Sequence, residues 1–221
     1  MNIARGLEQR LENLVDGVSA SVFRGHMHPV TMASRLVRQL DFLSFETPVG
    51  TQIPNDLTVA IHPADLDPTI DVAALEVELA AVGTVAADDA GWRLVGPIEV
   101  HLATSHAVPR GILQCAGDSL PGRLPAWGQL IAVDGSAVVP LTINRTLIGR
   151  ALDCDVRFAN YQVSRHHAVL TRVRGDVRIS DLGSSNGTRV NGDRISERPV
   201  DVPPGSLVTF GDLSFTYRSV A

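Results

Sequence analysis

Residues 163–193 read VSRHHAVLTRVRGDVRISDLGSSNGTRVNGD, and this stretch decides the fold of the second half of the chain. Two apolar and β-branched runs, 167–172 and 177–180, flank the turn sequence Arg174-Gly175-Asp176. Residues that favour strands therefore alternate at short intervals with residues that favour turns. The pattern predicts antiparallel strands joined by tight turns.

The same pattern continues on both sides of this stretch. Short strand-like runs recur at roughly 8–12-residue spacing between residues 129 and 221, without helical periodicity, which is typical of an antiparallel sandwich. Turn pairs such as Asp134-Gly135 and Gly211-Asp212 separate the runs. The expected strands are Gln129–Val133, Ala137–Leu141, Leu147–Ile148, His167–Arg172, Val177–Ser180, Thr188–Val190, Leu207–Phe210 and Phe215–Arg218.

The first half of the chain has a mixed pattern, in which apolar residues recur at helical spacing in some segments and alternate in others. The expected elements are helices over Arg5–Val22 and Pro29–Asp41, a strand over Asp56–His62, a helical stretch over Pro63–Val82, and a strand pair at Trp92–Val95 and Ile98–Ala103. These elements predict a small α+β domain.

Residues 116–128 (AGDSLPGRLPAWG) are rich in Gly and Pro and have no periodicity, which is the composition of a connector. We therefore expect an α+β domain at 1–115, a short linker at 116–128 and an all-β antiparallel sandwich at 129–221. The length of 221 residues suits two domains of ordinary size.

The charge is divided unevenly between the two halves. Residues 1–128 hold 8 Arg against 15 Asp and Glu, a net charge of −7, whereas residues 129–221 hold 11 Arg against 9 acids, a net charge of +2. All positive side chains are arginine, whose planar fork suits carboxylate and phosphate. The total of −5 argues against a general nucleic-acid binder.

The two cysteines, Cys115 and Cys154, indicate neither a disulfide framework nor a metal site by their spacing, and no cofactor is expected. The apolar stretches are shorter than the roughly 20 residues that a bilayer requires. Charges occupy the N-terminal segment where a signal peptide needs an apolar core. We therefore expect a cytoplasmic protein that does not insert into the membrane.

Three polar loops interrupt the expected sandwich: Ile148-Gly149-Arg150, Val163-Ser164-Arg165-His166-His167, and Asp181–Thr188 followed by Val190-Asn191-Gly192. Their order and spacing resemble the forkhead-associated (FHA) domain, which is marked by a Gly-Arg pair, a Ser-x-x-His block and a Ser/Thr-Asn-Gly-Thr loop ending in Asn-Gly. The resemblance covers about residues 129–219.

This resemblance implies that the module binds phosphothreonine peptides. A phosphothreonine carries about −1.5 to −2 charges and three acceptor oxygens, so a receptor needs positive charge and fixed donors. By the family pattern, Arg150 and Ser164 contact the phosphate and Arg165 adds a contact. Ser185 contacts the phosphorylated residue or its phosphate, and Asn186 holds the peptide backbone.

The other matched residues have architectural roles by the same resemblance. We expect tight backbone paths at Gly149 and Gly187, a buried hydrogen bond from His167, and a turn shaped by Thr188, Asn191 and Gly192.

Two alternative sites are considered. Ser164, His167 and Asp181 can be written as a hydrolase triad, but the chain has no Gly-x-Ser-x-Gly elbow, so we expect no catalytic residue. His26-Met27-His28 can be written as part of a metal site. No Cys, Asp or Glu lies at ligand spacing nearby, so a turn before a helix is favoured and no metal is expected.

The N-terminal half has a resemblance of its own. The segments Gly6–Gly17, His28-Pro29-Val30, Arg35-Leu36-Val37-Arg38 and Pro54–Val59 are similar to the N-terminal domain of actinobacterial FHA-domain proteins linked to Ser/Thr protein kinases. Members of that family usually carry a longer linker than the one here. The resemblance covers about residues 3–105 and implies only an interaction role for this domain.

The two resemblances together predict an adaptor without enzymatic activity. Its expected partners are phosphothreonine-containing proteins: a Ser/Thr kinase, a kinase substrate or a kinase-like regulator. The family implies a place in cell-wall synthesis or division at the inner face of the membrane. The alternative from another class is a nucleic-acid-linked regulator that uses the N-terminal helices, and the net charge of −7 over residues 1–128 counts against it.

Overall fold

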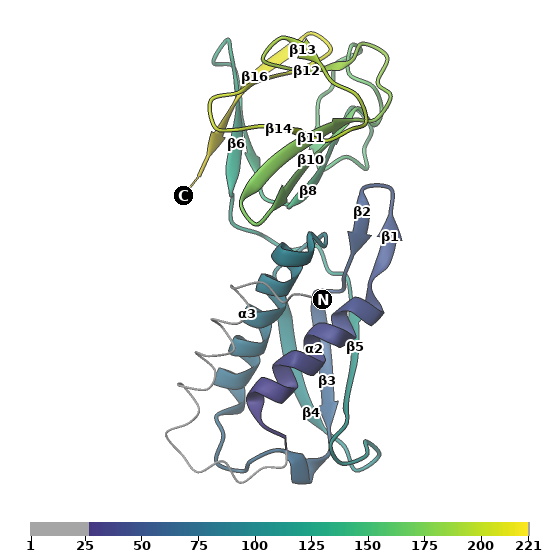
Figure 1. Ribbon diagram of the computed structural model, residues 1–221, viewed down its shortest axis with the longest axis vertical. Coiled ribbons are helices and arrows are strands. Elements are labelled where there is room, and N and C mark those ends of the chain that lie inside the picture. Colours follow the sequence, from purple (N-terminus) through teal and green to yellow (C-terminus); the bar gives the residue numbers. More distant parts are fainter. Residues whose placement is uncertain (1–26, 221) are drawn as a thin grey trace. The chain divides into compact units, whose positions relative to one another are not determined.

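A computed structural model describes residues 27–220 of the chain (Figure 1). The helix expected over Arg5–Val22 lies outside the described residues. The chain divides into two compact units. The first comprises the residues up to Glu46, Thr51–Ala90 and Leu94–Gly122, and the second comprises Thr47–Gly50, Gly91–Arg93 and the residues from Arg123 onward.

Helix α2 of the first unit spans Pro29–Leu43 and confirms the helix expected from Pro29. It begins where Pro29 occupies the first turn and the His28 side chain accepts a hydrogen bond from the Val30 amide at 3.3 Å. The apolar stripe of α2 includes Leu36 and Leu40, which are fully buried.

A three-stranded sheet lies beside this helix, in the order β4-β3-β5. The central strand β3 (Asp56–Ile61) confirms the expected strand and pairs parallel with β4 (Glu99–Thr104) and antiparallel with β5 (Leu113–Asp118). Because parallel neighbours need a crossover, α3 (Val72–Ala90) connects β3 to β4. Figure 1 shows α2 and α3 lying across one face of this sheet.

Two expectations for this unit are wrong in part. The helical stretch expected over Pro63–Val82 starts with a separate 3-10 turn at Pro63–Asp65, and its later part is confirmed by α3, which begins at Val72 and ends at Ala90. Asp67 accepts hydrogen bonds from both the amide and the hydroxyl of Thr69, which favours a turn. Asp71 then accepts the Ala74 amide at 3.1 Å and caps the new helix.

The strand pair expected at Trp92–Val95 and Ile98–Ala103 is also wrong in its first member, since no strand forms over Trp92–Val95. The second member is β4, which pairs with β3 instead. Strand β5 extends to Asp118, into the segment expected to connect the domains. A short separate hairpin is formed by β1 (Phe45–Thr47) and β2 (Gly50–Gln52).

The second unit is the expected antiparallel sandwich. One sheet has five strands in the order β14-β11-β10-β8-β9, and the other has six in the order β13-β12-β15-β16-β6-β7. The strands are β6 (Gly128–Ala132), β7 (Val138–Leu141), β8 (Arg145–Gly149), β9 (Val156–Arg157), β10 (Ala168–Val173), β11 (Asp176–Asp181), β12 (Thr188–Val190), β13 (Asp193–Arg194), β14 (Val200–Asp201), β15 (Leu207–Phe210) and β16 (Leu213–Ser219).

The inner faces of both sheets supply one hydrophobic core. Leu170 and Ile179 face each other across β10 and β11, and Phe158 stacks on Phe215 with ring centroids 4.9 Å apart. The core holds the strands rigidly, so the loops at their ends have defined positions.

No helix among residues 27–220 is long and apolar enough to cross a bilayer.

Candidate functional site

A cavity of about 680 Å³ lies where three loops of the sandwich meet. The loops connect β8 to β9, β9 to β10 and β11 to β12. All five residues predicted to bind a phosphopeptide line this cavity: Arg150, Ser164, Arg165, Ser185 and Asn186. Their roles in binding remain a prediction, but the structure brings them together from separate parts of the sequence.

The first two loops are joined by their backbones. The Arg150 amide donates to the Ser164 carbonyl at 3.0 Å, and the Ala151 amide donates to the Arg165 carbonyl at 3.1 Å. Gly149 permits this approach because a Cβ at that position would collide with the carbonyl oxygen of Arg165. The two arginines are therefore presented by loops that hold one another in place.

His167 links the second loop to the third from beneath the cavity. It is fully buried, its Nδ1 accepts the Ser164 amide at 3.0 Å, and its Nε2 lies 3.3 Å from the Gly187 carbonyl oxygen. Because Nδ1 accepts, Nε2 carries the proton and donates to Gly187. Burial lowers the pKa of His167, although the hydrogen bond to Gly187 and the charge of Asp181 act in the opposite direction.

Asp181 organises the third loop. Its carboxylate accepts hydrogen bonds from the Ser184 amide at 2.9 Å, the Ser184 hydroxyl at 2.6 Å and the Thr188 hydroxyl at 2.6 Å. Burial raises the pKa of Asp181, but the hydrogen bonds from Ser184 and Thr188 outweigh it, so the pKa is lowered. Ser184 is thereby committed to the loop, whereas its neighbour Ser185 is exposed at the cavity.

Two contacts position the ends of this loop. The Ser185 amide donates to Ser164 Oγ at 3.0 Å, and Asn186 Nδ2 donates to the Gln162 carbonyl at 2.9 Å. Farther on, Asn191 Oδ1 accepts the Leu207 amide at 2.9 Å, and Asn191 and Gly192 have φ angles of +53° and +95°. Asn191 and Gly192 form the turn between β12 and β13 and do not line the cavity.

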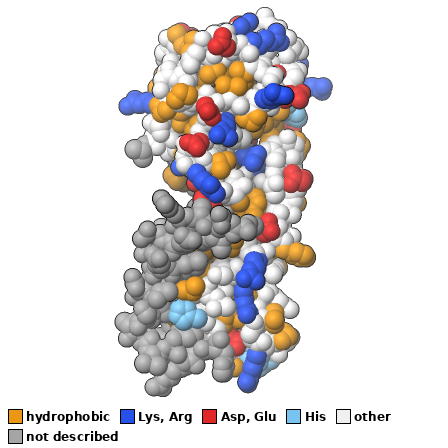
Figure 2. Space-filling model, in the orientation of Figure 1, with side chains coloured by type: hydrophobic (Ala, Val, Ile, Leu, Met, Phe, Trp, Pro, Cys, Tyr) orange, Lys and Arg blue, Asp and Glu red, His pale blue; other side chains and the backbone are white. Residues whose placement is uncertain are grey.

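Charge at the cavity is dominated by exposed arginine. Within residues 27–220, no ion pair engages the guanidinium of Arg150 or Arg165. In the upper part of Figure 2, which holds the sandwich, arginine and acidic side chains are interspersed over the visible surface. Unpaired guanidiniums at a concave site attract anions with several acceptor oxygens.

Four polar cavity residues were not predicted from the sequence: Asp153, Tyr161, Gln162 and His166. His166 stands inside the Ser-x-x-His block, and its Nε2 lies 2.9 Å from an oxygen of Asp153. The Tyr161 side chain is 96% exposed at the rim. Only their nearness to the matched motif residues could have indicated these positions.

The geometry does not assemble the hydrolase alternative. Ser164 Oγ accepts the Ser185 amide, whereas it is the Ser164 backbone amide that meets the ring of His167. The Asp181 carboxylate is engaged by Ser184 and Thr188, and the other ring nitrogen of His167 faces Gly187. For the metal alternative, His28 caps α2 and His26 lies outside the described residues.

Two family profiles match this sequence. The profile described as "FhaA, N-terminal domain" matches residues 5–116, half of the chain, and the profile described as "FHA domain" matches residues 146–211. The first match covers the α+β unit and the second covers the cavity residues.

Individual relatives match different shares of the chain. Transcriptional regulatory protein EmbR of Mycobacterium tuberculosis is 27% identical over 202 residues, covering 84% of this chain and 50% of EmbR. Mouse proliferation marker protein Ki-67 is 34% identical over 85 residues, covering 38% of this chain and 3% of Ki-67. This chain therefore spans half of EmbR and a small part of Ki-67.

Among solved structures, the FhaA FHA domain complexed with the intracellular domain of Rv3910 is 27% identical. The match covers 41% of the present chain and 99% of the chain in that structure, with a TM-score of 0.38.

Proposed function

The chain belongs to the family defined by the FhaA N-terminal domain and carries an FHA domain after it, and from this we propose that it is a phosphothreonine-peptide-binding adaptor in Ser/Thr kinase signalling. The ligand binds at the cavity between the three loops of the sandwich. Its phosphate is held by side chains, and its peptide backbone is held across the loop at Asn186.

One observation carries this proposal: two guanidiniums that form no ion pair within residues 27–220 converge with two serines on one cavity. A phosphate dianion satisfies such a set because it offers three acceptor oxygens and a charge that the guanidiniums can pair. A carboxylate ligand offers only two oxygens and half the charge, so it would leave some of these guanidinium and hydroxyl donors without a partner.

Each residue has a physical task in this proposal. Arg150 binds the phosphate through its planar fork, and Arg165 adds a second positive charge. Ser164 Oγ already accepts the Ser185 amide, so its hydroxyl proton is available to donate to a phosphate oxygen. Asn186 is held in place by its hydrogen bond to Gln162 and binds the backbone of the peptide. This contact fixes the position of the peptide along the site without selecting its sequence.

The proposed activity is binding rather than catalysis, and the FhaA-type domain recruits a second partner. Family membership supports a role in cell-wall synthesis or division, with the chain in the cytoplasm and brought to the inner membrane face by its partner. A pull-down from lysate with and without phosphatase treatment identifies the partner, which should be captured only in its phosphorylated form.

A nucleic-acid-linked role is the second candidate, since EmbR is named a transcriptional regulator. The net charge of −7 over residues 1–128 opposes it, because phosphate backbones require a basic face. Filter binding at low salt separates the candidates, and retention of DNA or RNA would favour the second.

The decisive test is calorimetric titration with paired peptides that differ only in threonine or phosphothreonine. We expect only the phosphorylated peptide to bind. Arg150→Ala removes a charge-assisted contact, worth about 1.5–3 kcal/mol, and should weaken binding about ten- to hundredfold.

The matched control is Arg198→Ala, which makes the same charge change in the same unit at an exposed residue outside the cavity. We expect this variant to bind like the wild type. Equal binding of the two peptides, or equal effects of the two substitutions, would contradict the proposal.

A further inference from the structure

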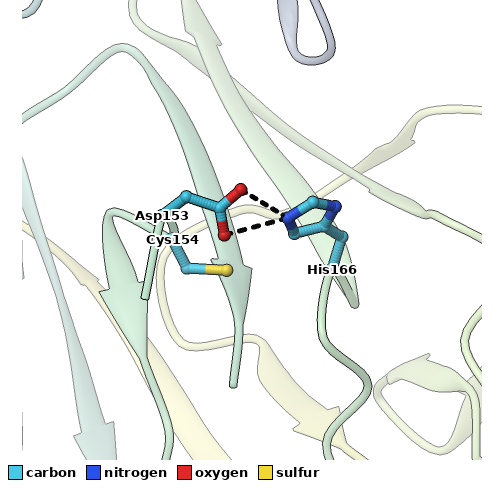
Figure 3. Close-up of side chains that lie close together, drawn as sticks. All are labelled: Asp153, Cys154 and His166. Atoms are coloured by element: carbon cyan, nitrogen blue, oxygen red, sulfur yellow. Dashed lines mark hydrogen bonds and ion pairs between the residues drawn. The ribbon is translucent and has the colours of Figure 1, made fainter. Parts of the chain in front are cut away.

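Three side chains of different chemistry meet at the rim of the cavity: Asp153, Cys154 and His166 (Figure 3). One ligand atom from each lies within 4.8 Å of the other two. Both Asp153 oxygens are 2.9–3.0 Å from His166 Nε2. Figure 3 shows the carboxylate, the sulfur and the imidazole turned toward one another.

These donors match the preferences of zinc. Thiolate, imidazole and carboxylate are the zinc ligands of proteins, and three of them with a fourth position for solvent form an open tetrahedral site. Bond lengths of about 2.0–2.3 Å place tetrahedral ligand atoms roughly 3.3–3.6 Å apart. Asp153 and His166 are exposed, so small side-chain rotations bring the three atoms to this spacing.

The position of Asp153 gives a second reason to expect a cation at this cluster. Among the described residues that line the cavity, it is the only acid, and it stands in the cavity with two arginines. A fixed carboxylate repels a phosphate dianion unless a positive partner neutralises it. A metal ion shared with His166 and Cys154 supplies that partner.

The cluster also joins the loops that carry the two arginines. Asp153 and Cys154 belong to the β8–β9 loop, and His166 belongs to the β9–β10 loop beside Arg165. Cys154 Sγ already donates to the Arg165 carbonyl oxygen at 3.2 Å. An ion bound here would tie the two loops together next to the arginines.

We propose that Asp153, Cys154 and His166 bind a divalent zinc-type ion and that the bound ion strengthens phosphopeptide binding at the adjacent cavity. The metal site stands on the cluster itself, whereas the coupling rests on the proposed function.

The direction of the coupling follows from charge. The Cys154 thiol carries a proton, because Sγ donates to the Arg165 carbonyl oxygen. Coordination releases the thiol proton to solvent, and the proton that His166 Nε2 donates to Asp153 moves through solvent to Nδ1, so the charge of the ring does not change. Two positive charges enter and one leaves, so the rim gains one positive charge, and we expect phosphopeptide affinity to rise about two- to tenfold.

The first test uses Co²⁺ alone with the untagged full chain, because cobalt replaces zinc and reports its ligands by absorption. We expect intense visible bands of tetrahedral Co²⁺ and a near-ultraviolet thiolate-to-cobalt band, both displaced by Zn²⁺. Cys154→Ser should abolish the thiolate band. Cys115→Ser is the matched control and should retain it, because Cys115 lies in the other unit.

A second cluster in the chain sharpens this test. Asp56, Glu99 and His101 also gather donor atoms within 4.8 Å, but they include no sulfur. Cobalt bound there gives no thiolate band and is lost in His101→Gln rather than in His166→Gln. Absence of the thiolate band in the wild type, or its persistence in Cys154→Ser, overturns the proposed metal site.

The second test titrates the phosphothreonine peptide with and without one equivalent of Zn²⁺. We expect tighter binding with zinc in the wild type and in Cys115→Ser, and no zinc effect in Cys154→Ser. Cobalt binding without a zinc effect on the peptide overturns the coupling. Failure of the peptide to bind under either condition overturns the proposed function and the coupling, while the cobalt result still decides the metal site.

Discussion

His167 connects two loops of the site without reaching the ligand cavity. Its ring accepts the Ser164 amide and donates to the Gly187 carbonyl, and its edge packs on Phe210 with centroids 5.8 Å apart. The Gly187 carbonyl also accepts a hydrogen bond from the Gly211 amide. Removal of the His167 ring therefore leaves only the Ser164 amide without its hydrogen bond.

His167→Ala should therefore lower stability and affinity together. An unsatisfied buried amide costs about 1–3 kcal/mol, and we expect the free energy of unfolding in urea to fall by that amount. Phosphopeptide affinity should fall several-fold, because Ser164 loses the contact that fixes it. By contrast, Arg150→Ala should reduce affinity with little change in stability.

The control for His167 is His101→Ala, since His101 is exposed and its 3.2 Å contact with Asp56 is a surface contact of the kind that contributes about 0–1 kcal/mol. If His167→Ala has the same free energy of unfolding as the wild type, the ring does not hold the two loops in place.

Some residues of the site can be identified from the sequence, and others cannot. Arg150 and Ser164 are recognisable because their motifs have a fixed local spacing. Asp153 and His166 meet only because two loops fold against each other through Gly149, and no spacing along the chain encodes that meeting. The cavity residues that belong to the FHA motifs can therefore be predicted from the sequence. The cluster of Asp153, Cys154 and His166 at the rim of the cavity cannot.

At the scale of elements, the sandwich was easier to predict than the α+β unit. Alternating runs and turn residues indicate strands locally, and β10 and β11 pair across the expected turn at Arg174 and Gly175. In the first unit, the sequence pattern predicts too early a start for α3, because apolar residues continue back past Asp67, where side-chain hydrogen bonds impose a turn. The parallel partner of β4 is remote in sequence, so local pattern could not identify it.

The loop between β11 and β12 yields a prediction about pH, because Asp181 is its main acceptor. Its pKa in the folded chain lies below the unfolded value of about 3.9, so the ionised carboxylate stabilises the fold above that pH. This stabilisation is lost as the pH falls through the native pKa. Asp181→Asn should lower the free energy of unfolding by about 1–3 kcal/mol at pH 7.

The difference between wild type and Asp181→Asn should then shrink below about pH 4, as urea unfolding at several pH values can measure. Asp176→Asn, at an exposed position in the same strand, serves as the control and should change stability little. A difference that stays constant down to pH 3 would show that the deficit does not come from the ionised carboxylate.

For the whole molecule, local and total charge oppose one another. The chain has a net charge of −5 and should repel a phosphate dianion at long range, whereas Arg150 and Arg165 attract it at contact distance. Salt screens charges beyond a Debye length of about 10 Å at 0.1 M and about 3 Å at 1 M. The direction in which salt changes the affinity therefore shows whether the net charge of the chain or the two contact arginines dominate.

We expect the contact arginines to dominate, because a pair at hydrogen-bond distance interacts more strongly than charges spread over the chain. Phosphothreonine-peptide affinity should fall about three- to tenfold when NaCl is raised from about 0.05 to 0.5 M. Arg150→Ala should show a shallower dependence, because one of the screened contacts is already gone. Calorimetric titration at both salt concentrations measures this, and an affinity that rises with salt would mean that the net negative charge outweighs the two arginines.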